Sequence, residues 1–256
     1  NGFSGGPSNT GIGHIIDRNL VRLVGFVGDP NFLALASGWT FFYELSRNRL
    51  RPIAFAAAAL VLVLTLSRGA LVSAALATLV WIAISGAGKL FWRRFVPWST
   101  FATLAGLFLW FRVPAFRFVL ERRFGVSETM SINELSSSRY LIWLDTINGA
   151  LSRPFGIGLN STHAFLGDLY GSIKYSHNTY LDVAFEAGLI GLILFLVLQM
   201  VLLFQAWRIR RELPWLLPTV LFIQGSAAFL SALFHETFYI YIALVSSLTV
   251  RRFRKG

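Results

Sequence analysis

Long apolar segments alternate with short polar connections along most of this 256-residue chain. Several of the segments are shorter than the roughly 20 residues that an α-helix needs to cross a bilayer at about 1.5 Å per residue, so their flanks must complete them. The pattern predicts an all-α integral membrane protein with about seven transmembrane helices. The segments are residues 31–44, 52–66, 70–87, 97–111, 179–207, 213–233 and 238–250.

One apolar stretch, residues 52–87, is too long for a single transmembrane helix. As one helix it would be about 54 Å long, whereas the hydrocarbon core of a bilayer is about 30 Å thick. The only polar break inside it is the sequence TLSRGA. We therefore expect the chain to turn at Ser67, Arg68 and Gly69.

The composition supports the membrane assignment, because 55% of the residues are hydrophobic and only 14% are charged, against about a quarter charged in soluble domains. The net charge of +11 falls in short basic clusters between apolar segments rather than along one polar face. We therefore exclude nucleic acid as a partner and interpret the clusters as topology signals. They lie at residues 47–51, 89–94, 208–211 and 251–255.

The basic clusters also predict an orientation. Alternation through seven helices places all four clusters on one side, which the positive-inside rule assigns to the cytoplasm. The four histidines of the sequence then face outward. The predicted organisation is an extracytoplasmic N-terminal segment, a first group of about four transmembrane helices, a long extracytoplasmic loop with short helices, the last three transmembrane helices and a basic cytoplasmic tail. These parts are residues 1–30, 31–111, 112–178, 179–250 and 251–256.

Two of these parts carry further expectations. In the long loop, Tyr140, Trp143, Leu144, Ile147 and Leu151 recur at helical spacing and predict a helix that lies over the outer face. The Gly-rich residues 1–13 are typical of a mobile linker. The sequence begins without a Met, and we expect it to be a C-terminal part of a larger polytopic protein.

The pair His177 and Asn178 stands directly before an apolar segment. Thr179 and Asp182 have the spacing of a capping box, so we expect a helix to begin at Thr179 with His177 ahead of its positive end. That position favours a neutral imidazole, which a general base needs. Asp182 and Glu186 share one helix face and could hold the imidazole or a sugar hydroxyl. The alternative is that His177 is only a hydrogen-bonded interface residue.

Three arginines are further candidates. Arg68 could bind two phosphate oxygens through its planar guanidinium or extend to lipid headgroups, and Arg139 could bind a phosphate or be a solvated charge. Arg22 precedes Asp29 and Pro30, a pair typical of a helix start. We favour a structural role for the stretch from Arg22 to Pro30. A contact with the substrate is the weaker alternative.

The absence of several motifs limits the reactions that this chain could catalyse. The sequence has no cysteine, no closely spaced pair of aspartates and no metal-binding histidine pair, so we predict neither a metal site nor a cofactor. It also lacks a P-loop and a Gly-x-Ser-x-Gly elbow. Because the outer face offers no nucleoside triphosphates, a bond-forming reaction there needs an already activated substrate, such as a lipid-linked pyrophosphate. Arginines would neutralise its leaving group and a histidine would deprotonate the incoming hydroxyl.

Four stretches resemble the O-antigen ligase and polymerase superfamily of bacterial envelope proteins. They are RLVGFVGDPNFLALA, TLSRGALVSAALATLVW, SSSRYLIWLDTINGALSRPFGIGLNS and YSHNTYLDVAFEAGLIGLILFL, and the resemblance covers residues 22 to about 250. The resemblance implies a glycosyltransferase of the bacterial cytoplasmic membrane that moves a glycan from undecaprenyl pyrophosphate to an acceptor outside. It implies pyrophosphate binding by Arg68 and Arg139 and a base role for His177. Family members usually have ten or more transmembrane helices.

Several interpretations stay open. The acceptor could be a lipid, a protein or a growing polysaccharide, so that a ligase and a polymerase are both possible. Beside His177, Arg68 and Arg139, we consider a weaker set of substrate contacts. A transporter of a small solute or anion is the alternative from another class, although its ionisable residues should lie near mid-membrane, and a non-enzymatic scaffold is a third. The weaker set is Asn178, Glu186, Arg22, Asp29 and His235.

Overall fold

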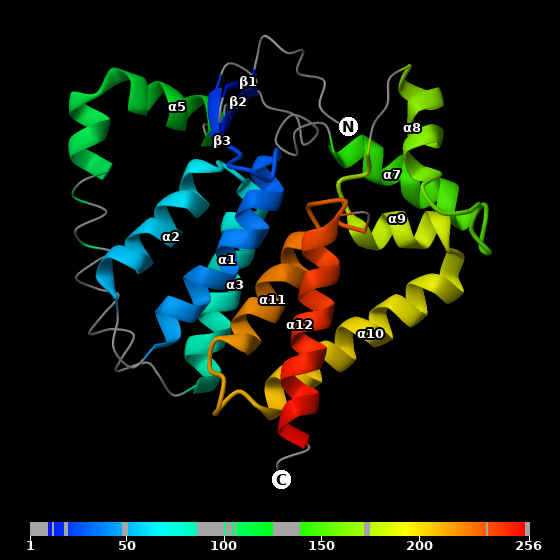
Figure 1. The fold of residues 1–256 in the computed structure, drawn as a ribbon. Coiled ribbons are helices and arrows are strands. Elements are labelled where there is room, and N and C mark those ends of the chain that lie inside the picture. Colours follow the sequence, from blue (N-terminus) through cyan, green and yellow to red (C-terminus); the bar gives the residue numbers. More distant parts are fainter. Residues whose placement is uncertain are drawn as a thin grey trace.

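A computed structural model describes most of the chain. It covers residues 10–11, 13–17, 20–47, 51–85, 100, 104, 106–124, 139–171, 175–233 and 235–253. These residues are mainly helical, as predicted (Figure 1). The helices are α1 (Pro30–Ser46), α2 (Pro52–Leu64), α3 (Arg68–Ser85), α5 (Pro114–Phe124), α7 (Arg139–Leu151), α8 (Thr162–Tyr170), α9 (Thr179–Glu186), α10 (Gly188–Arg208), α11 (Leu216–Ala227) and α12 (Glu236–Phe253).

The centre of the fold is α11, which is apolar and buried on almost every side. It packs against α1, α3 and α10, so its all-round hydrophobicity matches its surroundings. Small residues permit the close approaches: Gly225 faces Ser73 of α3, and Gly38 of α1 faces Phe222. A side chain added at Gly38 would overlap the Phe222 ring, so glycine is required there.

One helix of the described residues, α10, is long and apolar enough to cross a membrane. Shorter apolar helices are Pro52–Leu64, Arg68–Ile84, Leu216–Ala227 and Glu236–Leu248. Most of the apolar segment at residues 97–111 lies outside the described residues, although residues 106–112 are helical. The protein is thus a helical chain that fits a membrane, and the number of seven transmembrane helices stays a prediction.

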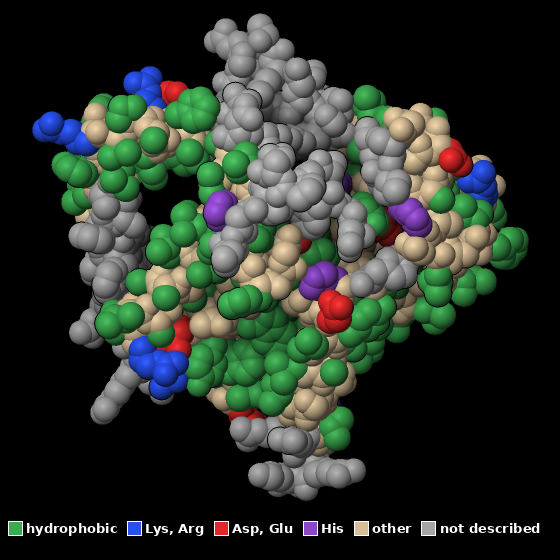
Figure 2. Space-filling view, turned by 45° about the horizontal axis from the view of Figure 1, so that its top comes forward, with side chains coloured by type: hydrophobic (Ala, Val, Ile, Leu, Met, Phe, Trp, Pro, Cys, Tyr) green, Lys and Arg blue, Asp and Glu red, His purple; other side chains and the backbone are tan. Residues whose placement is uncertain are grey.

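The helix ends that flank the four basic connections lie together at the lower end of the bundle in Figure 1. They are the ends of α1 and α3, the start of α2, and the ends of α10 and α12. The sheet and α7–α9 lie at the opposite, upper end. Figure 2 shows histidine side chains on this upper face and a mainly hydrophobic surface below it. The clusters themselves lie partly outside the described residues, so their grouping on one side and the side of the membrane stay predictions.

The prediction of one continuous helix over residues 179–207 is wrong. The helix breaks at Ala187 and Gly188, and α9 and α10 run in different directions (Figure 1). Gly188 has a φ of +70°, and an added Cβ would lie 2.4 Å from the Pro154 oxygen. The loop after α7 therefore packs directly against the bend, where Leu189 N–H donates to Pro154 O over 2.9 Å. A contact between residues this far apart in the sequence cannot be predicted from hydrophobic periodicity.

The all-α prediction is also wrong near the N-terminus. Strands β1 (Thr10–Gly11), β2 (His14–Asp17) and β3 (Leu20–Leu23) form a three-stranded antiparallel sheet. Leu20 and Arg22 are buried while Val21 between them is exposed, the two-residue alternation of a strand. The predicted linker therefore ends in a strand, and residues 1–9 lie outside the described residues.

Two local predictions are confirmed. The turn between the second and third apolar segments is present, because α2 ends at Leu64 and α3 begins at Arg68. The predicted helix at the end of the long loop is present as α7. This helix buries Ile142, Thr146 and Gly149. Its large apolar side chains are mostly exposed, including Tyr140, Leu144, Ile147 and Leu151.

Candidate functional site

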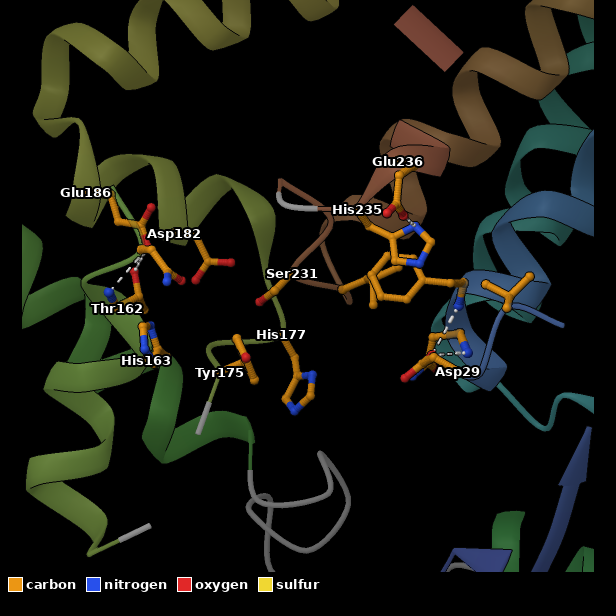
Figure 3. Close-up of a pocket in the computed structure, with 15 residues that line it drawn as sticks. Asp29, Thr162, His163, Tyr175, His177, Asp182, Glu186, Ser231, His235 and Glu236 are labelled. Carbon is orange, nitrogen blue, oxygen red and sulfur yellow. Dashed lines mark hydrogen bonds and ion pairs between the residues drawn. The ribbon is translucent and has the colours of Figure 1, made fainter. Parts of the chain in front are cut away.

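A pocket of about 470 Å³ lies at the upper end of the bundle, between the segments that precede α1, α9 and α12 and the start of α8 (Figure 3). Its lining includes three histidines and four carboxylates. Four residues of the predicted site converge here, although they are far apart in the sequence: Asp29, His177, Glu186 and His235. Sequence analysis placed them on the same outer side but did not predict a shared cavity.

His177 has an unusual backbone conformation, with a φ of +53°. A left-handed conformation of a non-glycine residue costs about 1–3 kcal/mol and is often found at functional sites. Ser176 stabilises this turn: its hydroxyl accepts from Asn178 N–H over 3.0 Å and donates to Asp182, and its carbonyl accepts from Trp143 Nε1 over 2.8 Å. The imidazole is therefore presented to the pocket by a backbone that is fixed on several sides (Figure 3).

The predicted start of a helix at Thr179 is confirmed. Its N-cap, however, is Asn178, whose Oδ1 accepts from Tyr180 N–H and Leu181 N–H at 3.0 and 3.2 Å. Asp182 accepts from Ser176 instead of closing a capping box. The amide oxygen of Asn178 is thus used by the helix end, and a substrate contact through the rest of this side chain stays a prediction.

The segment after α11 connects the elements that carry the three main candidates. Thr179 N–H donates to Leu230 O over 3.1 Å, and Arg139 Nη1 donates to Phe229 O over 2.9 Å. The backbone of Gly69, next to Arg68, lies against the Phe229 side chain. The pocket lining includes Leu230 but neither arginine. His177 and the two arginines therefore belong to elements that meet on residues 229–230, and pyrophosphate binding stays a prediction.

One end of the pocket is acidic and buried. Asp182 and Glu186 are each 4% exposed. Burial raises the pKa of Asp182 from 3.8 to about 6; the Ser176 and Ser231 hydroxyls lower it, while Glu186 raises it further. Glu186 Oε1 accepts from Thr162 N–H and Oγ1 at 3.2 and 2.9 Å. Its other oxygen, Oε2, is buried without a hydrogen-bond partner among the described residues.

The other end of the pocket holds Asp29 and His235 (Figure 3). Asp29 is the N-cap of α1, as the Asp-Pro pair predicted, and accepts from Asn31 N–H and Phe32 N–H at 2.6 and 3.1 Å. Burial raises the pKa of Asp29. The His235 ring stacks on Phe32 with centroids 3.5 Å apart, and burial lowers the pKa of His235. This end therefore favours an uncharged imidazole.

Arg22 has the structural role that the sequence favoured. It is 5% exposed, its Nε donates to Thr65 O over 2.8 Å, and its Nη2 donates to Asn31 Oδ1 over 3.3 Å. Ser67 Oγ donates to the same Asn31 oxygen over 2.9 Å. The arginine thus joins the sheet to α1 and to the turn before Arg68. It is not part of the pocket lining, and a substrate contact stays a prediction.

Several pocket residues were not singled out by sequence analysis. Thr162, His163, Tyr175 and Ser231 all line the cavity. His163 follows the glycine-containing loop that contacts the bend between α9 and α10, and this contact cannot be inferred from local spacing. Within the ranges that the structure describes, no three His, Asp or Glu side chains are grouped as a metal site requires.

Comparison with known proteins identifies the family. A search of curated proteins found no match. A family model described as O-antigen ligase matches residues 53–196, which is more than half of the chain. The matched range contains Arg68, Arg139, His177 and Glu186, whereas Asp29 and His235 lie outside it. The protein whose pocket presents His177 at the end of this helical bundle therefore belongs to the O-antigen ligase family.

Proposed function

We propose that this chain transfers a glycan from an undecaprenyl pyrophosphate carrier to an acceptor hydroxyl at the outer face of the cytoplasmic membrane. Membership of the O-antigen ligase family supports glycosyl transfer of the ligase or polymerase type. The observation that carries the proposal is the position of His177, which faces a cavity large enough for sugar rings from a fixed, left-handed turn. The proposed orientation has seven transmembrane helices with the pocket outside.

In the proposed reaction, a ring nitrogen of His177 takes the proton of the acceptor hydroxyl. The acceptor oxygen forms a bond to the anomeric carbon of the glycan, and the bond between this carbon and the pyrophosphate oxygen breaks. Undecaprenyl pyrophosphate leaves with both electrons of that bond. Arg68 and Arg139 stabilise the negative charge of the leaving group.

The position of the two arginines is compatible with this division of roles. They belong to elements that contact the Phe229 side of the segment after α11, whereas Leu230 of the same segment lines the pocket. The pyrophosphate would then bind beside the pocket. The bond that breaks, between the anomeric carbon and the pyrophosphate oxygen, would lie between the arginines and His177. Asn178, Asp29 and His235 are proposed as weaker contacts of the acceptor or the glycan.

The direct test is transfer by His177→Ala in proteoliposomes that contain the complete native protein and a labelled glycan on undecaprenyl pyrophosphate. Loss of a general base lowers a rate by about 10² to 10⁴, so we expect almost no product at a normal protein level. Addition of EDTA to the wild type should change little, because no metal takes part in the proposed reaction.

The matched control is His14→Ala, since His14 is exposed on β2 and outside the pocket lining. His163 and His235 are unsuitable controls, because both line the pocket. If His177→Ala kept more than about a tenth of wild-type transfer, the effect would be smaller than a general base supplies and the assignment would be wrong.

A further inference from the structure

We infer that the buried acidic end of the pocket is a binding subsite for the hydroxyl groups of one sugar ring, with Glu186 as the main hydrogen-bond acceptor and His163 as the second. The inference rests on the proposed function, because the sugar belongs to the glycan that is transferred or to its acceptor. The proposed ligand of this end of the cavity is a sugar ring. We call Thr162, His163, Asp182 and Glu186 the acidic subsite.

The two carboxylate oxygens of Glu186 differ. Oε1 is held by the backbone and hydroxyl of Thr162, which fixes the orientation of the carboxylate. Oε2 is buried and has no hydrogen-bond partner among the described residues, and Glu186 itself lines the cavity. A buried acceptor without a donor is costly. A ligand that brings a donor to Oε2 would remove this cost.

The fold places Glu186 rigidly. It is the last residue of α9, directly before the bend at Gly188, and its carbonyl accepts from Gly158 N–H over 3.0 Å. An added Cβ at Gly156 would lie 2.3 Å from the same carbonyl oxygen, so the loop backbone is in direct contact with this end of α9. Oε2 is therefore a preorganised acceptor rather than the end of a flexible side chain.

His163 supplies a second acceptor or donor on the same side of the cavity (Figure 3). Its Nδ1 is also buried without a hydrogen-bond partner in the described part of the chain, and its ring stacks near that of Tyr175, with centroids 6.0 Å apart. Unmatched polar atoms on two residues of the lining, together with the aromatic ring of Tyr175, suit a ligand that has several hydroxyls and an apolar face. A sugar ring has both.

The charge of the cavity lining favours a sugar over the pyrophosphate as its ligand. Its lining contains four carboxylates and, among the described residues, neither Lys nor Arg. Two of these carboxylates belong to the acidic subsite and are buried. A pyrophosphate would be repelled there, whereas neutral hydroxyl groups can donate to the carboxylates. The acidic subsite therefore binds the neutral part of the substrate.

The test measures binding of free sugars by saturation-transfer NMR on the complete protein in detergent, without any carrier lipid. The probes are glucose, galactose and N-acetylglucosamine, with inorganic pyrophosphate as a separate probe whose binding is followed by its phosphorus NMR signal. We expect at least one sugar to bind the wild type. Glu186→Gln, which keeps the size but replaces one acceptor by a donor, should weaken that binding about tenfold or more. Pyrophosphate binding should be unaffected.

Glu212→Gln is the matched control, because Glu212 is exposed and outside the pocket lining. Should Glu186→Gln fail to fold, His163→Ala must show the same loss. In transfer assays Glu186→Gln should raise KM more than it lowers kcat. Absence of sugar binding to the wild type, or equal binding by Glu186→Gln, would overturn the subsite. Because binding requires no transfer, this outcome is separate from a failure of the His177 test.

Discussion

Arg139 Nη1 donates a hydrogen bond over 2.9 Å to the backbone oxygen of Phe229, 90 positions further along the chain. The same phenylalanine packs against Gly69, the residue after Arg68. The next residue, Leu230, accepts a hydrogen bond from Thr179 N–H at the start of α9. One short segment thus couples the positions of both proposed pyrophosphate ligands to the position of His177.

Arg68→Lys and Arg139→Lys should each lower kcat/KM for the lipid-linked donor by about tenfold or more, because an ammonium lacks the planar fork that meets two phosphate oxygens. The measurement is initial transfer rate against donor concentration in proteoliposomes. Arg47→Lys is the control, since Arg47 lies in the connection between α1 and α2 at the opposite end of the bundle.

Arg139 also has the structural contact with Phe229, so its variant needs a second measurement. We expect an unchanged unfolding temperature for Arg68→Lys and a small decrease for Arg139→Lys. Near-normal transfer by both variants at normal protein levels would contradict the proposed role and leave them as structural residues or lipid contacts.

Gly188→Ala should destabilise the protein strongly. Its φ of +70° costs a residue with a Cβ about 1–2 kcal/mol, and the new atom would lie 2.4 Å from Pro154 O. Gly171→Ala is a matched control, because Gly171 has a φ of +66° and nothing within 4 Å of an added Cβ. Thermal unfolding in detergent should therefore show a clearly larger decrease for Gly188→Ala. Equal decreases would mean that the loop does not hold the bend.

Asp182 should make the protein less stable as pH rises from about 4 to about 6. Its pKa is raised from 3.8 to about 6 in the folded protein, so in this range the unfolded chain loses the proton while the folded chain keeps it. The free energy of unfolding then falls with pH, by at most about 3 kcal/mol from this group. Asp182→Asn should remove that fall.

The measurement is the unfolding temperature of the wild type and of Asp182→Asn at several pH values. Relative to the wild type, Asp182→Asn should become more stable as the pH rises from about 4 to about 6. The Asn side chain can still accept from Ser176, so the local hydrogen bond is kept. A constant difference from pH 4 to pH 7 would show that the folded carboxyl titrates as in the unfolded chain.

The proposed orientation can be tested with single cysteines, because the sequence contains none. Ser152→Cys lies after α7 on the pocket side, and Ser46→Cys lies at the end of α1 beside a basic connection. A membrane-impermeant maleimide added to intact cells should label Ser152→Cys and spare Ser46→Cys until the cells are opened. The reverse pattern would place the pocket in the cytoplasm and exclude the proposed reaction.

Local sequence signals predicted a good part of the fold. The Asp29–Pro30 pair marked the start of α1, the polar break before Gly69 marked a turn, and Thr179 marked the start of α9. Each of these depends on neighbouring residues only. Capping was less specific, because Asn178 and Thr179 are both good N-caps and only the fold decides between them.

The sequence was a poor guide to features that depend on contacts between residues far apart along the chain. The bend at Gly188 depends on its contact with the loop at Gly156, which lies far away in the sequence. The buried face of α7 could not be predicted from the sequence, because the close packing of Gly149 against Phe185, rather than a stripe of large apolar residues, determines the buried side. Apolar side chains are not a guide to the interior of a protein whose exterior is also apolar.

In the proposed orientation, the bend at Gly188 would also make α10 a spacer between two levels of the membrane. Its 21 residues span about 31 Å at about 1.5 Å per residue, close to the thickness of the hydrocarbon core. In the proposed orientation, Arg208 marks the inner boundary, and α9, turned aside at the top, is held near the outer one. The height of His177 and Glu186 above the lipid tails would then depend on the length and the tilt of this one helix, which runs obliquely to α11 and α12 (Figure 1). A pyrophosphate attached to a lipid is held at a similar height by its own anchor, so the protein and its substrate would share the bilayer as a common reference.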